Sequence, residues 1–153
     1  MEQRQATARI LPHSLEAEKS VLGGMLISRE AAELVCEALK PEDFYLPAHQ
    51  DIYAAMLQLY NRGNAVDSVT LIDALEREGK LNAVGSVSYI TELSLFVPSA
   101  ANVSHYIRIV EDRSVMRQLI RAGTDIVQDA QTGERPVGDM LDDAERRIFN
   151  ISM

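Results

Sequence analysis

The stretch that decides the fold is NVSHYIRIVEDRSVMRQLIRAGTDIVQDAQT, residues 102–132. Asn102 is a suitable helix N-cap, and no strong helix breaker follows it before Gly133. At a rise of 1.5 Å per residue, a helix over this stretch is roughly 45 Å long. A compact domain in a chain of 153 residues does not need a helix of that length. The sequence therefore predicts one long helix that serves two parts of the molecule.

The apolar face of this helix changes direction half-way along. The first stripe consists of Val103, Tyr106, Ile107 and Val110. At 100° per residue a second set falls on the opposite side, over an arc of about 160°. This set is Val115, Met116, Leu119, Ile120, Ile126 and Val127. We expect the first half of the helix to pack on the preceding helices and the second half on other segments.

The residues after Gly133 predict an antiparallel partner helix. Pro136 suits a first helical position, and a loop of about five residues, 131–135, makes the two helices neighbours. The apolar stripe of the second helix is Val137, Met140, Leu141, Ala144, Ile148 and Ile151. One partner helix cannot cover an arc of about 160°, so a second hairpin from another subunit is expected to cover the rest.

The upstream residues show helical periodicity and no convincing strand. The expected helices are 14–26, 29–39, 47–62, one capped by Asp67 or Ser68 and closed by Gly79, and 87–95. In the second of them we expect Ala31, Leu34, Val35, Ala38 and Leu39 to be buried. The fold class is therefore all-α, a helical globular bundle followed by a long αα-hairpin that dimerises. We expect a globular subdomain over 1–101, with 1–10 disordered, and a hairpin subdomain over 102–153.

Composition excludes several classes of protein. The chain has 15 Lys+Arg against 23 Asp+Glu, and a net charge of −8 argues against a free-standing nucleic-acid binder. A lone cysteine, Cys36, cannot form an internal disulfide and points to a reducing compartment. No run approaches the roughly 18 apolar residues of a membrane span, and the N-terminus lacks the apolar stretch of a signal peptide. A cytoplasmic location without membrane attachment is expected.

Little in the sequence indicates chemistry. It has no G-x-x-x-x-G-K-[ST] motif for phosphates. His49 and Asp51 resemble a metal pair only superficially, because residues two apart on a helix point to different sides. We therefore expect a surface or capping role for His49, a solvent-exposed His105, and a small buried hydrophobe in Cys36. No catalytic, cofactor-binding or metal-binding residue is predicted.

Two charged patterns have simple explanations. Glu16 and Glu18 are interpreted as first-turn acids, favoured by the helix dipole. Arg113, Arg117 and Arg121 recur every four residues and form a basic ridge. That ridge is interpreted as a solvated face paired with acids, with a partner-docking ridge as the alternative.

Residues 15–26, LEAEKSVLGGML, resemble the opening of the N-terminal domain of DnaB-type replicative DNA helicases. Further motifs match in the same order: DFY (43–45) with AHQ (48–50), VDSVTL (66–71), GSVSYI (85–90), VPSAAN (97–102) and YIRIVE (106–111). The resemblance covers roughly residues 11–151. One departure is Ser86, where the family pattern often has a second glycine.

The resemblance implies a helical globule and a hairpin that pairs with the hairpin of a neighbouring subunit. In the hexameric ring of the bacterial replisome, beside the nucleoid, these dimers form a collar that recruits a DnaG-type primase and, in some systems, a helicase loader. The motor domain, with its ATP and magnesium, would follow a linker that begins about where the sequence stops. The full-length parent is expected to be an ATP-dependent DNA helicase active in primosome formation, whereas these residues are expected to hold no enzyme, no cofactor and no direct DNA-binding site.

The residues nominated for self-association are Val115, Met116, Leu119, Ile120, Ile126, Val127, Leu141, Ala144 and Ile148. Those nominated for binding the primase are Glu16, Tyr89, Ile120 and Ile126. An intrachain core is the alternative for the first set, and Tyr89 also fits a core aromatic.

Three other interpretations stay open at this point. The helicase-binding domain of a primase is thought to share this helical plan. A small all-helical metal-dependent hydrolase could be built around His13, His49 and His105. A direct role in binding single-stranded DNA is disfavoured by the net charge of −8.

Overall fold

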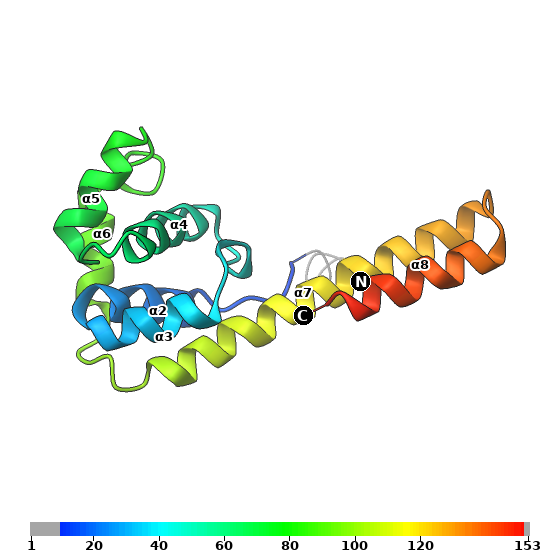
Figure 1. The fold of residues 1–153 in the computed structure, drawn as a ribbon, viewed down its shortest axis with the longest axis horizontal. Coiled ribbons are helices and arrows are strands. Elements are labelled where there is room, and N and C mark those ends of the chain that lie inside the picture. Colours follow the sequence, from blue (N-terminus) through cyan, green and yellow to red (C-terminus); the bar gives the residue numbers. More distant parts are fainter. Residues whose placement is uncertain (1–9, 152–153) are drawn as a thin grey trace. The chain divides into compact units, whose positions relative to one another are not determined.

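The computed structural model describes residues 10–151, which form two compact units, 13–111 and 112–151 with 10–12. The first unit holds α2 (Leu15–Ile27), α3 (Arg29–Ala38), the 3-10 turn η1 (Pro41–Asp43), α4 (Pro47–Asn61), α5 (Ser68–Arg77) and α6 (Ser86–Phe96) (Figure 1). The helix α7 (Val103–Thr132) starts in the first unit and continues into the second, which also contains α8 (Val137–Phe149). The described residues contain helices and no strand, which confirms the all-α prediction. The disorder expected over residues 1–10 falls mostly on residues 1–9, outside the described residues.

The helices begin and end where the sequence supplies caps. The Ser14 hydroxyl accepts the backbone N–H of Ala17 at 3.2 Å, as expected for the N-cap of α2. Asp67, rather than Ser68, caps α5, and its carboxylate and the Thr70 hydroxyl form a reciprocal capping box. These caps satisfy backbone groups that the helix itself leaves unpaired.

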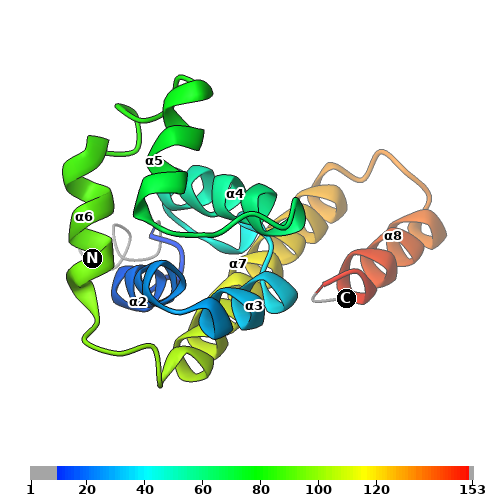
Figure 2. The same cartoon turned by 60° about the vertical axis from the view of Figure 1, so that its left-hand side comes forward.

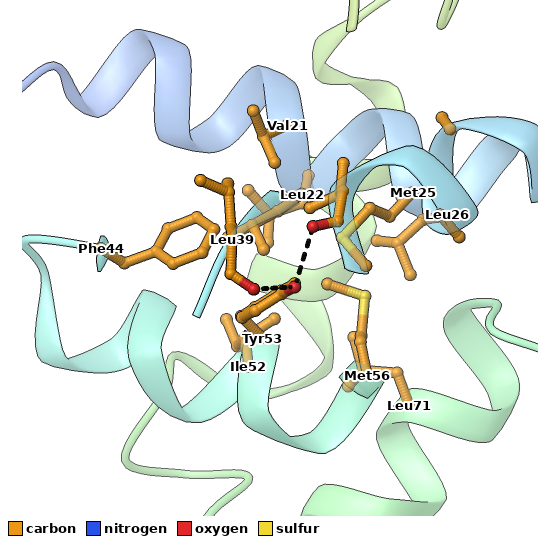
Figure 3. Packing of buried hydrophobic residues seen from close by; sticks show 14 of the residues in the cluster. Val21, Leu22, Met25, Leu26, Leu39, Phe44, Ile52, Tyr53, Met56 and Leu71 are labelled. Carbon is orange, nitrogen blue, oxygen red and sulfur yellow. Dashed lines mark hydrogen bonds between the residues drawn. The ribbon is translucent and has the colours of Figure 1, made fainter. Parts of the chain in front are cut away.

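The core of the first unit is built around α2, whose residues from Val21 to Leu26 are all buried. The neighbouring α6 packs closely on α2, because Gly23 lacks a side chain: a Cβ there would lie 2.3 Å from the Leu93 carbonyl oxygen. On the other side, the Tyr53 hydroxyl lies 2.8 Å from the Leu39 carbonyl oxygen and 3.1 Å from that of Val35 (Figure 3). The core therefore combines apolar packing with a satisfied polar group.

The expected burial of α3 is partly wrong. Ala31, Val35 and Leu39 are buried, but Leu34 is 46% exposed and Ala38 is also exposed. The helix packs against α2 and α4 only, so its buried face is narrower than the periodicity indicated.

The first part of α7 belongs to the core of the first unit, as its apolar stripe predicted. Val103, Ile107 and Val110 are buried with the residues of α2 to α6. The two units meet between residues 111 and 112, inside this helix, whereas the sequence placed the start of the hairpin subdomain at residue 102. The later division follows from this packing.

Within the described residues, no helix combines the length and the apolar character needed to cross a membrane.

Candidate protein-interaction surface

In the second unit, α8 runs back along the distal half of α7 (Figure 2), and ion pairs fasten the two helices along one edge. The Arg135 guanidinium in the connecting loop contacts the carboxylates of Asp129 on α7 and Asp143 on α8, the latter at 2.6 Å. Nearer the other end, Arg147 pairs with Asp125 at 2.9 Å. The hydrogen bond from Arg135 holds the pKa of Asp129 below its usual value.

The apolar side of the same hairpin is left open. No residue of α8 is buried, although its periodic apolar stripe is that of a packed helix. Six of the nine residues nominated for self-association are between 42% and 60% exposed. These six are Met116, Leu119, Ile120, Val127, Leu141 and Ile148.

The other three nominated residues, Val115, Ile126 and Ala144, are half-buried. On the α7 helical wheel, Ile126 lies between the exposed apolar arc and the edge that carries Asp125 and Asp129. The hairpin thus shelters only one margin of the apolar arc. The set stays a prediction as an assembly surface, and its exposed members are free of intrachain cover.

The charged residues of distal α7 lie opposite this arc. Arg113, Arg117, Arg121, Asp125 and Asp129 follow one another at every fourth position. The apolar arc from Val115 to Ala130 therefore contains no charge, and we call it the uncharged arc of α7.

The interpretation of the basic ridge as a solvated face is wrong for Arg117. Its side chain is buried, and its Nη1 donates to the Pro12 carbonyl oxygen at 2.8 Å. Arg121 is exposed and Arg113 is half-buried. The central arginine therefore anchors residues before α2 to the hairpin unit.

The second place of interest is a buried polar cluster in the first unit, formed by Glu18, His49 and Tyr89. The Glu18 carboxylate lies 2.8 Å from His49 Nδ1 and accepts the backbone N–H of Tyr45 at 2.7 Å. His49 Nε2 lies 2.6 Å from the Tyr89 hydroxyl oxygen. An ionised Glu18 accepts from Nδ1, so Nε2 of a neutral His49 accepts the hydroxyl proton of Tyr89. The cluster ties α2, α4 and α6 together.

This cluster corrects two interpretations from the sequence. His49 is fully buried rather than on the surface, and Glu18 is only 2% exposed rather than a plain first-turn acid. A signal was present, since Glu18 precedes Leu22 by four residues and Met25 by seven and so shares their buried face. Its partner could not be found in the same way, because His49 is 31 residues away.

The turn before α6 fixes where Tyr89 points. Gly85 has φ +115°, and a Cβ there would lie 2.7 Å from the Cβ of Tyr89. Ser86 also has a positive φ, +64°, which explains why glycine suits the position where the family pattern departs. Tyr89 is half-buried, and burial raises the pKa of its hydroxyl. Of the residues nominated for primase binding, Glu16 and Ile120 are exposed, whereas Tyr89 and Ile126 are half-buried.

The histidines have separate neighbours. His13 stacks on Tyr45 with ring centroids 3.9 Å apart, and His105 lies edge-on to Tyr106. Across residues 10–151, no group of three or more His, Cys, Asp or Glu side chains could hold a metal ion.

Cys36 is half-buried rather than fully buried, and burial raises the pKa of its thiol to about 11. A thiol with that pKa is a poor nucleophile at neutral pH.

Comparison with known proteins gives a consistent result. Residues 10–112 match the family model described as "DnaB-like helicase N terminal domain". The replicative DNA helicase DnaB of Geobacillus stearothermophilus is 47% identical over 144 residues, which are 94% of this chain and 32% of that protein. The replicative DNA helicase DnaC of Bacillus subtilis is 44% identical over the same shares. The chain thus spans about a third of the length of these relatives.

Solved structures agree. A crystal structure of the N-terminal domain of DnaB helicase from Mycobacterium tuberculosis has a TM-score of 0.88 and 42% identity, covering 93% of this chain and all of that one. A structure of a DnaB-like replicative helicase, described with its interactions with primase, has a TM-score of 0.73 and 27% identity. It covers 92% of this chain, which matches 32% of that one.

Proposed function

Because this chain belongs to the DnaB-like helicase N-terminal domain family, we propose that it joins helicase subunits through its hairpin and presents a surface to a primase. In this proposal ATP and magnesium belong to the motor of the full-length helicase, and this chain works in the bacterial cytoplasm as an assembly and docking part. The single observation that carries the proposal is the open apolar side of the hairpin.

That surface is suited to an obligate contact. Burial of apolar area contributes about 25 cal/mol per Å², and a stable interface covers about 800 Å² on each partner. Exposed apolar side chains from both helices of the hairpin line the same side, so a second hairpin would cover them together. A 13-residue helix with no buried residue is marginal on its own, so such a cover would also stabilise α8.

The primase part of the proposal rests on a relative. The DnaB-like helicase at 27% identity is described with its interactions with primase, and its fold matches this chain at a TM-score of 0.73. We extend that partner to this chain, with Glu16 and Ile120 as the exposed contact candidates and Tyr89 and Ile126 as half-buried ones. A hexameric ring and a loader protein belong to the same proposal.

The assembly part is tested with Leu119→Asp, weighed by light scattering over a range of concentrations. The wild-type chain is expected to reach twice its mass of 17.0 kDa, and Leu119→Asp to stay at the mass of one chain, because a charge cannot be buried unpaired in the contact. Leu95→Asp is the matched control, since Leu95 is 77% exposed but lies on α6 in the other unit. A wild-type mass of one chain at every concentration, or an unchanged mass for Leu119→Asp, contradicts the assembly role.

The docking part has its own test. Calorimetric titration of the wild-type chain with a purified DnaG-type primase is expected to show saturable binding, which Ile120→Asp weakens. Absence of heat and of a complex by size-exclusion chromatography refutes primase docking and leaves the assembly role standing.

A further inference from the structure

Gly123 lies inside α7, where glycine is the poorest helix former after proline. The fold of the hairpin does not demand it. A Cβ at Gly123 would meet no heavy atom within 4 Å outside its own turn of helix, in contrast to Gly23, where a Cβ would lie 2.3 Å from a backbone oxygen. Gly123 also lacks a positive φ. Neither steric crowding nor backbone conformation within this chain accounts for the glycine.

Its position on the helix is informative. Gly123 sits one turn after Leu119 and one turn before Val127, with Ile120 beside it, and these three side chains are all exposed. It therefore occupies the middle of the uncharged arc of α7. A shallow groove forms there, lined by Ile120, Gly123, Thr124, Val127, Gln128 and Gln131. The missing side chain leaves a notch in an otherwise continuous apolar surface.

We propose that Gly123 is the point where the α7 helix of a second copy of this chain crosses this one. The inference rests on the proposed self-assembly and adds the place and closeness of the helix crossing. Helices with ordinary side chains at the contact pack with axes about 8–10 Å apart, and glycine at the crossing permits a closer approach.

Two features favour a second copy as the occupant. In a symmetric dimer the residue at the twofold axis faces its own copy, so any side chain there is met twice, and glycine adds nothing on either side. The uncharged arc from Val115 to Ala130 also offers no ion pair to a charged partner, whereas it matches an identical uncharged arc. Leu119 and Val127 would then pack around the crossing from both copies.

The dissociation constant of the dimer tests this placement, measured by sedimentation equilibrium for Gly123→Ala. We expect it to rise about tenfold or more, because two added methyl groups would overpack a close contact. Gly138→Ala is the matched control, since Gly138 lies inside α8, is exposed and has no heavy atom within 4 Å of its Cβ position. The control is expected to leave dimerisation unchanged. Circular dichroism of both variants should show at least wild-type helicity, which separates weakened association from unfolding.

A cross-link gives a second readout. In a Cys36→Ser background, Gly123→Cys should form an interchain disulfide on mild oxidation, because a disulfide needs Cα atoms about 4.4–6.8 Å apart, and Gly138→Cys should not. A dimer whose affinity is unchanged by Gly123→Ala, or which does not cross-link through position 123, overturns the crossing point but leaves self-assembly intact. A wild-type chain that stays monomeric overturns both and assigns the arc to another partner.

Discussion

Replacing Glu18 by alanine tests whether the buried polar cluster holds the first unit together. The side chain is 2% exposed, and its carboxylate serves His49 Nδ1 at 2.8 Å and the Tyr45 backbone N–H at 2.7 Å. Glu18→Ala leaves both donors without their acceptor. Each buried donor left unpaired costs about 1–3 kcal/mol, so the free energy of unfolding is expected to fall by about 2–5 kcal/mol.

The assay is urea unfolding followed by circular dichroism at 222 nm, with two comparison variants. Glu16→Ala removes an exposed carboxylate from the same turn of α2, and its effect is expected to stay within about 0.5 kcal/mol. Glu18→Gln keeps an acceptor for Tyr45 and should fall between the two. A Glu18→Ala loss no larger than that of Glu16→Ala would refute the claim that the cluster carries stability.

Two further predictions concern the turn before α6 and the free thiol. Gly85→Ala is expected to lower the free energy of unfolding by about 2 kcal/mol, because φ is +115° and the new Cβ would lie 2.7 Å from the Cβ of Tyr89. Thermal melts should show a smaller loss for Gly79→Ala, where φ is +70° and the space is open. For Cys36, the pKa raised to about 11 predicts slow alkylation by iodoacetamide at pH 9, where an unfolded thiol of pKa 9.0 is half ionised. The raised value also predicts that stability falls as pH rises from 9 toward 11, since the unfolded chain loses its proton first. An alkylation rate at pH 9 equal to that of the urea-unfolded chain would contradict the burial of this thiol.

The hairpin could be read from the sequence because its determinants are local. A run without breakers from Asn102 to Gly133 predicts the long helix, and residues three and four apart define its face whatever the rest of the chain does. The shift of that face, from the stripe containing Ile107 to the arc containing Leu119, follows from the same periodicity. The structure buries the first and leaves the second exposed.

The buried cluster could not be read in this way. Glu18 and His49 are 31 residues apart, and His49 and Tyr89 are 40 apart. In the sequence each is a polar residue near the start of a helix, which favours an exposed interpretation. The structural consequence depends on which helices become neighbours.

The sequence by itself determined the helices, their caps and the family, because hydrophobic period, capping side chains and short motifs act within one or two turns. Only the tertiary structure decided which polar groups go inside. The burial of Glu18, His49 and Arg117, and the exposure of Leu34, depend on how elements distant in the chain come together. The physical reason is that a buried polar or charged group is tolerated only where another segment brings a partner within hydrogen-bond distance, and periodicity along one helix contains no information about that segment.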